Sequence, residues 1–124
     1  MFSEMKNVIP VLFSLFFATS AALAGGPEVV DVSISKAGMV WNISVTLRHD
    51  DEGWDHYADG WEVLDARGER LGYRKLMHPH VDEQPFTRSL RGVVIPDGTR
   101  EIFIRTHCSE HGWDSKVTRV ELKP

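Results

Sequence analysis

Residues 39–49 carry the clearest pattern in the chain, because apolar and polar side chains alternate along the whole stretch. A period of two residues places every second side chain on the same face of a β-strand. The apolar face holds Met39, Trp41, Ile43, Val45 and Leu47, and His49 stands at its end. This pattern predicts a strand that buries one face, in a protein whose core is built from sheets.

Six further short runs have the composition of β-strands and are separated by turn residues at roughly even spacing: 28–35, 60–65, 70–77, 86–95, 99–107 and 116–122. No stretch has a convincing helical period. Seven short strands in about 100 residues are typical of a sandwich of two sheets. We therefore expect an all-β fold, a seven-stranded immunoglobulin-like or fibronectin-like β-sandwich, although the paired cysteines of antibody domains are absent.

The N-terminus has the pattern of a secretory signal peptide. An apolar run over residues 8–17 leads to Ala22-Leu23-Ala24, which fits the small-x-small cleavage rule. The predicted organisation is a signal peptide over 1–24 and a β-sandwich domain over 25–124. The apolar run is too short for a permanent membrane anchor, and no cysteine follows the cut. We expect the mature domain in the periplasm or secreted, without a membrane anchor.

The number and placement of the charged residues argue against nucleic acid as a partner. The chain has 14 basic and 18 acidic residues, for a net charge of −4. The basic residues are scattered singly and form no stripe that could neutralise phosphates, so nucleic acid is not an expected partner. Cys108 is the only cysteine. In an oxidising compartment it is a buried thiol, an intermolecular link or a metal ligand.

The order of the predicted strands separates two kinds of connection. Successive strands run up and down, so their connections alternate between the two poles of a sandwich. The turns at 36–38, 66–69 and 96–98 are short and free of histidine, whereas long loops fall at the other pole. All six histidines lie in or beside those long loops, together with Cys108: His49, His56, His78, His80, His107 and His111.

This clustering predicts a metal site, because imidazole and thiolate are strong ligands for transition metals. Cys108 and His111 have a Cys-x-x-His spacing, and Pro79 separates His78 from His80. The candidate ligands are His49, His56, Cys108 and His111, followed by His78 and His80, for an ion of copper, zinc or iron. Neighbouring carboxylates are further ligands or acceptors that orient a ring N–H: Asp50, Asp51, Asp55, Asp59, Asp82 and Glu110.

Simpler interpretations stand beside this one. His49 could cap the core face of its strand, and His78 and His80 could be ordinary loop residues. His107 alternates with Cys108, so only one of these two side chains should point inward. Three tryptophans near this pole are expected to close the top of the core, or to surround the site and shield it from water: Trp54, Trp61 and Trp113.

The segment His107-Cys108-Ser109-Glu110-His111-Gly112-Trp113 resembles the end of superoxide reductases of the desulfoferrodoxin and neelaredoxin type. In that family an immunoglobulin-like domain holds non-haem iron by four histidines and one cysteine, and Cys108 and His111 match the spacing of the last two. His49 and the stretch from His56 to Glu62 resemble the family's upstream histidine region. The chain departs from the family because no histidine precedes His49 and serine replaces asparagine at Ser109.

Three functions follow from these observations. The first is a periplasmic metal-binding protein that carries, buffers or senses its ion. The second, which the resemblance implies, is a superoxide reductase-like enzyme with a non-haem iron. The third is a metal-free module whose loops bind a periplasmic partner protein or a glycan. The sequence leaves open whether the protein is an enzyme.

Overall fold

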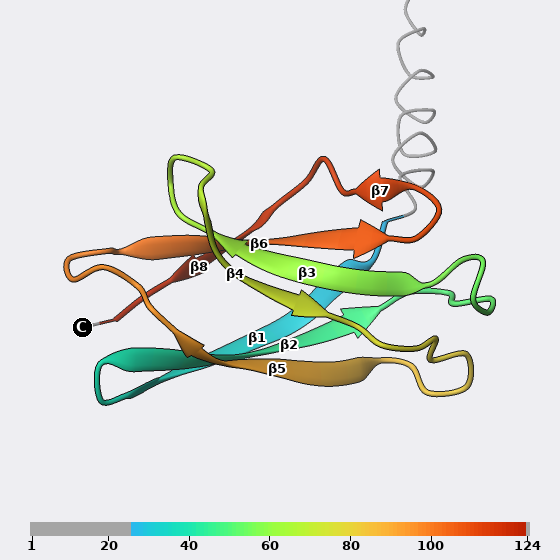
Figure 1. Cartoon of the computed structure of the whole chain (residues 1–124), viewed down its shortest axis with the longest axis horizontal. Helices are drawn as coiled ribbons and strands as arrows, with labels where there is room; N and C mark the ends of the chain where they lie inside the picture. Colours follow the sequence, from blue (N-terminus) through green and yellow to red (C-terminus); the bar gives the residue numbers. More distant parts are fainter. Residues whose placement is uncertain (1–25, 124) are drawn as a thin grey trace, which may run out of the picture.

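The computed structural model describes residues 26–123, which form two antiparallel sheets (Figure 1). The first sheet has the order β1-β2-β5, from β1 (Glu28–Ala37), β2 (Val40–Arg48) and β5 (Phe86–Val93). The second has the order β4-β3-β6-β7, with β8 also paired to β6, from β3 (Ala58–Leu64), β4 (Arg70–Lys75), β6 (Glu101–Cys108), β7 (Gly112–Trp113) and β8 (Thr118–Glu121). The expected all-β sandwich is confirmed. The predicted signal peptide lies outside the described residues.

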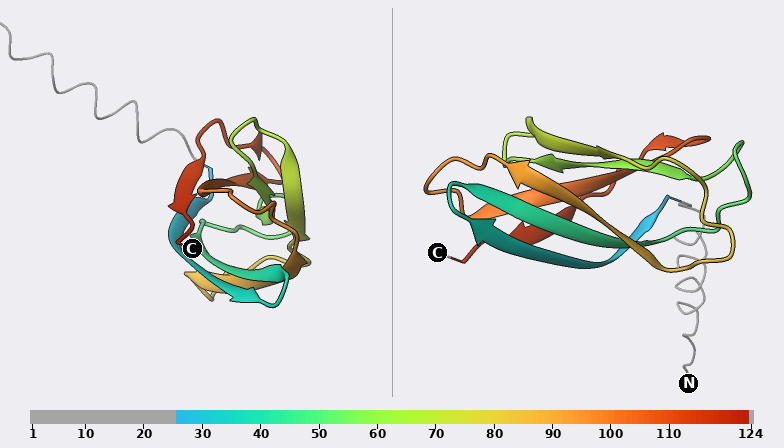
Figure 2. Two further views of the ribbon diagram at one scale, coloured as in Figure 1. Left: turned by 90° about the vertical axis from the view of Figure 1, so that its left-hand side faces the viewer. Right: turned by 60° about the horizontal axis from the view of Figure 1, so that its bottom comes forward.

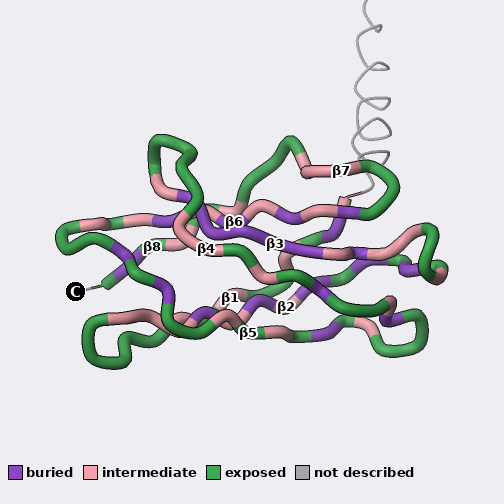
Figure 3. Tube along the Cα trace, in the orientation of Figure 1, coloured by how far each residue is buried: buried purple, intermediate pink, exposed green. Residues whose placement is uncertain are grey.

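The core lies between the two sheets, which face each other in the end-on view of Figure 2. Alternation puts Ile43, Val45 and Leu47 of β2 inward, where each is at most 1% exposed. β6 contributes a matching inward row that includes Ile102 and Ile104. Figure 3 shows buried stretches along strands of both sheets. The hydrophobic surface that the strands bury against each other is the main driving force for this arrangement.

An additional two-residue strand lies within the predicted loop at 108–115. Gly112 has φ of 81°, a left-handed conformation that glycine adopts without steric cost, and this turns the chain back on itself. Gly112 then pairs with Cys108, and Trp113 pairs with His107. The sequence did not predict this strand because two residues are too few to show a period.

Only one of the three tryptophans expected to close the core does so. Trp61 is fully buried in β3, as expected. Trp54 is 67% exposed, so its predicted place in the core was wrong. The prediction for Trp113 was also wrong, since its ring packs against His107, Tyr73 and Arg105 and not in the core cluster.

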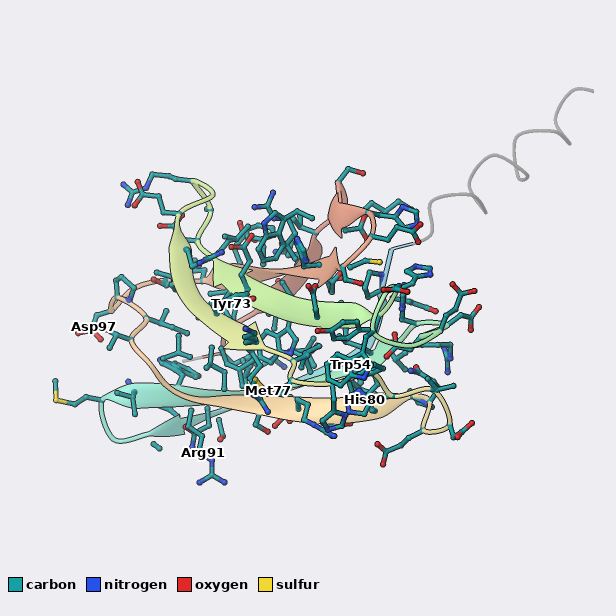
Figure 4. The ribbon with its side chains drawn as sticks, turned by 45° about the vertical axis from the view of Figure 1, so that its right-hand side comes forward. Trp54, Tyr73, Met77, His80, Arg91 and Asp97 are labelled. Atoms are coloured by element: carbon teal, nitrogen blue, oxygen red, sulfur yellow. The ribbon has the colours of Figure 1, made fainter. Side chains whose placement is uncertain are left out.

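The connections alternate between the two ends of the sandwich as the strand order predicts. The turns after β1, β3 and β5 lie at one end in Figure 1, and the loops after β2, β4 and β6 lie at the other. In Figure 4, Trp54 and His80 mark the end with the long loops, and Asp97 marks the opposite end. None of residues 26–123 belongs to a helix capable of crossing a membrane.

Candidate metal centre

His49 and Cys108 end two inward-facing rows of side chains, one from each sheet. His49 follows β2 and continues the row of Ile43, Val45 and Leu47, and it is 6% exposed. Cys108 is the last residue of β6, and its thiol is fully buried and free of any disulfide. Because the sheets face each other, an imidazole and a thiol meet where the apolar core ends.

The loop after β2 brings His56 to the same place. Its backbone is closed by a hydrogen bond from Glu52 N to His56 O at 2.8 Å. Ser109 then ties this loop to the turn after Cys108, because Tyr57 N donates to Ser109 Oγ and Ser109 N donates to Tyr57 O, both at 2.9 Å. As a result, ligand atoms of His49, His56 and Cys108 all lie within 4.8 Å of one another.

Two consecutive carboxylates orient the two imidazoles. His49 Nδ1 donates to Asp51 Oδ1 at 2.6 Å, and His56 Nδ1 donates to Glu52 Oε1 at 2.8 Å. A proton on Nδ1 leaves Nε2 of the neutral ring with a free lone pair. Metal-ligating histidines in proteins usually have this arrangement, with the second ring nitrogen donating to a carboxylate or carbonyl. The two rings are perpendicular, with centroids 5.0 Å apart.

A metal ion fits this group because it would satisfy an otherwise orphaned atom. His56 Nε2 is buried and has no hydrogen-bond partner. A buried polar atom without a partner costs free energy, so such atoms are rare and call for an explanation. Zinc, copper and iron all bind imidazole nitrogen together with thiolate sulfur. The donor set therefore matches a transition metal.

The carboxylates also affect the protonation of His56. The hydrogen bond to Glu52 raises the pKa of His56 above its usual value, and this outweighs the partial burial that lowers it. The charge of Glu110 raises the pKa further, since one of its oxygens lies 3.4 Å from His56 Nδ1. Protons therefore compete for this ring more strongly than for an isolated imidazole.

His111 lies at the exposed rim of the group. Its ring is 5.3 Å from that of His56, and its side chain is 55% exposed. Its ligand atom groups with those of His56 and Glu110 and not with those of His49 and Cys108. The Cys-x-x-His turn therefore contributes a buried thiol to one group that contains His56 and an exposed imidazole to the other.

The structure does not bring His78 and His80 into either of these groups. His78 is exposed, and its Nδ1 donates to the carbonyl of Pro79. His80 is buried, stacks on Phe86 at 3.9 Å, and accepts a hydrogen bond from Arg88 on Nε2 at 2.8 Å. Burial lowers the pKa of His80, and the charge of Arg88 lowers it further, so protonation of this ring is disfavoured.

His107 lies on the outer face of the sheet, as its alternation with Cys108 requires. Its Nδ1 donates to Asp59, and its ring packs edge-on against Trp113. It is therefore separated from the candidate centre by the strand itself.

Sequence reasoning missed three residues that shape this centre, namely Glu52, Gln84 and Ser109. Glu52 stands four residues before His56, a spacing that could have suggested the pair. Gln84 donates to the carbonyl of His80 and accepts from His49 N. Contacts such as those of Gln84 and Ser109 join segments that are distant in the sequence, so no local sequence pattern predicts them.

No family model matches the chain, but comparisons with known proteins give a relative and a similar structure. The relative is a Halomicrobium mukohataei protein described as "Putative lipoprotein", 44% identical over 97 residues. The match covers 77% of this chain and 47% of the relative, so the chain spans about half the length of that protein.

The similar structure is a superoxide reductase from Nanoarchaeum equitans, with a TM-score of 0.52 and 16% sequence identity. The match covers 80% of this chain and 93% of that chain. At this identity the likeness concerns the fold alone. The resemblance noted in the sequence is confirmed as a weak and partial one, and the chain shares the β-sandwich fold of a superoxide reductase.

Proposed function

We propose that the protein is an exported metal-binding protein that holds one transition-metal ion at the end of its sandwich. His49, His56 and Cys108 bind the ion, and His111 approaches from the rim as a fourth ligand. His78 and His80 are not ligands in this proposal. The protein carries, buffers or senses the ion.

One observation carries the proposal. Two imidazoles have their Nδ1 atoms held by Asp51 and Glu52, and a buried thiol lies within 4.8 Å of ligand atoms of both rings. Burying His56 Nε2 without a partner is unfavourable, and a bound metal ion would remove that cost. A metal ion turns the same atoms into ligands.

The ligand types favour copper, zinc or iron over magnesium or calcium. Two imidazoles and a thiolate suit the softer metals, whereas hard cations prefer oxygen ligands. When bound, a copper or iron ion supplies one-electron redox chemistry, and zinc supplies a fixed positive charge. Elemental analysis of the purified protein identifies which of the three metals is bound.

Export is the second part of the proposal. Residues 1–24 serve as a signal peptide, and residues 25–124 form the mature domain in the periplasm or outside the cell. The signal-like N-terminus supports this, and so does the description of the Halomicrobium mukohataei relative as a "Putative lipoprotein". N-terminal sequencing of the exported protein tests it, with cleavage expected after Ala24.

Metal binding is tested by equilibrium dialysis of the purified protein against Zn²⁺, Cu²⁺ and Fe²⁺. We expect tight binding of one of these ions, and the His49→Ala variant should bind it at least tenfold more weakly. His78→Ala is the matched control, because it removes a histidine of the same pole that lies outside the group. Equal weakening by both variants would contradict the ligand assignment.

A second candidate function is a superoxide reductase-like iron enzyme. The shared fold and the Cys-x-x-His turn favour it. Iron-loaded protein should then consume superoxide and show a visible thiolate-to-iron band that Cys108→Ser abolishes. Two results would contradict the enzyme function while leaving metal binding intact. Either the protein binds only zinc, or the iron-loaded protein neither consumes superoxide nor shows the band.

A further inference from the structure

Asp51 is the most completely enclosed carboxylate in the candidate centre. Its side chain is 0% exposed, and its two oxygens accept three hydrogen bonds. Oδ1 accepts from His49 Nδ1 at 2.6 Å and from Ala58 N at 2.9 Å. Oδ2 accepts from His80 N at 2.8 Å.

The buried charge of Asp51 has an unusual partner. Within residues 26–123, Asp51 forms an ion pair with no lysine or arginine, and the only ionisable side chain that it hydrogen-bonds is the His49 ring. Removing a carboxylate from water is costly unless hydrogen bonds and an opposite charge compensate. A positive ion bound at His49 Nε2 would polarise the ring and so offset part of the cost of burying the Asp51 carboxylate.

Asp51 also joins the loop at 78–84 to the site, although that loop supplies none of the grouped ligand atoms. Its bond to His80 N fixes the start of the loop, and Gln84 completes a second link by accepting from His49 N at 2.9 Å and donating to His80 O at 2.8 Å. Gln84 therefore holds the backbone of His49, whereas Asp51 holds its ring.

We infer that Asp51 is the positioning residue of the metal centre: it fixes the tautomer and rotation of His49 and strengthens Nε2 as a donor. This inference rests on the proposed metal-binding function. Glu52 makes the equivalent contact to His56 but is 73% exposed, so water can replace it. The two neighbouring carboxylates thus differ in burial while sharing the same chemistry.

The test compares Asp51→Asn with Glu52→Gln, using Co²⁺ as a spectroscopic probe. The amide introduced by Asp51→Asn would place an N–H₂ group against at least one of the three donors, so His49 loses its fixed orientation. We expect Asp51→Asn to weaken Co²⁺ binding by roughly 10- to 100-fold, as removal of a hydrogen-bond partner of a ligating histidine does in other metalloproteins. The variant should also shift the visible Co²⁺ bands. Glu52→Gln should weaken binding less than Asp51→Asn does, because water can replace the exposed carboxylate. The control that should leave the affinity unchanged is Asp59→Asn, which removes the carboxylate beside His107 outside the centre.

The visible bands separate positioning from a purely structural role. Affinity that falls while the bands remain those of the wild type, or affinity that does not fall, would overturn the inference. Nitrogen chemical shifts of His49 in the metal-free wild type give a second measurement that needs no variant. They should report a proton on Nδ1 and none on Nε2, and the opposite tautomer would refute the role of Asp51.

These results remain distinct from a failure of the proposed function. If the wild type takes up no Co²⁺, Zn²⁺, Cu²⁺ or Fe²⁺, the metal-binding proposal fails. The tautomer of His49 would still show whether Asp51 holds the ring.

Discussion

At the end of the sandwich that carries the long loops, two neighbouring carboxylates differ in exposure: Asp51 is buried, and Glu52 is exposed. The same contrast holds for the histidines, since His80 is buried beside Arg88 while His78 lies in solvent. Exposure therefore decides how a residue of this pole responds to pH or to substitution.

Burial makes His80 a source of pH-dependent stability in the metal-free protein. Its pKa is lowered from 6.5 in the folded state, so the unfolded chain binds a proton at a pH where the folded chain does not. The contribution of His80 is fully present above pH 6.5 and is lost as the pH falls below it. His80→Phe should keep the stacking on Phe86 and flatten this dependence, as measured by urea unfolding from mildly acidic to mildly basic pH. An unchanged slope would contradict the assignment.

Glu62 should stabilise the fold more than an exposed acidic residue does. It is 2% exposed and bonds Arg70 Nε at 2.8 Å and Arg105 Nε at 2.7 Å. Glu62→Gln should lower the free energy of unfolding by about 1.5–3 kcal/mol, the range for hydrogen bonds to charged groups. The control is Glu28→Gln, which removes an exposed pair with Arg48 and should have no measurable effect in urea. Equal effects would contradict this account.

At the scale of elements, the site depends on how strands end. The inward rows of β2 and β6 end in His49 and Cys108, and the turn at Gly112 sets where His111 and Trp113 follow. Two glycines with similar left-handed backbones lie at opposite poles, Gly38 with φ of 69° and Gly112 with φ of 81°.

These two glycines provide a matched pair of variants. An added Cβ meets nothing within 4 Å at either position, so the cost of alanine is conformational, about 1–2 kcal/mol in each case. Gly112→Ala should also weaken metal binding, because the strained turn displaces His111, whereas Gly38→Ala should leave it unchanged. Titration with Zn²⁺ measures both, and equal affinities would show that the turn does not position the site.

At the scale of the whole molecule, alternation of apolar residues was enough to predict the sandwich and the end that gathers the histidines. It also predicted that only one of His107 and Cys108 would point inward. It could not predict which histidines meet, because that depends on loop contacts such as those of Ser109 and Gln84. For the same reason it grouped His78 and His80 with the other histidines, although Arg88 and Phe86 hold the ring of His80 elsewhere.

The central claim is that two facing sheets and one loop assemble a metal site from His49, His56 and Cys108. The most direct test is the metal content of the exported protein, purified without added metal, compared with that of Cys108→Ser. We predict about one copper, zinc or iron ion per wild-type chain and a clear loss of that ion in the variant. Wild-type protein that is free of metal as isolated, and that takes up none of these ions at micromolar concentration, would contradict the claim.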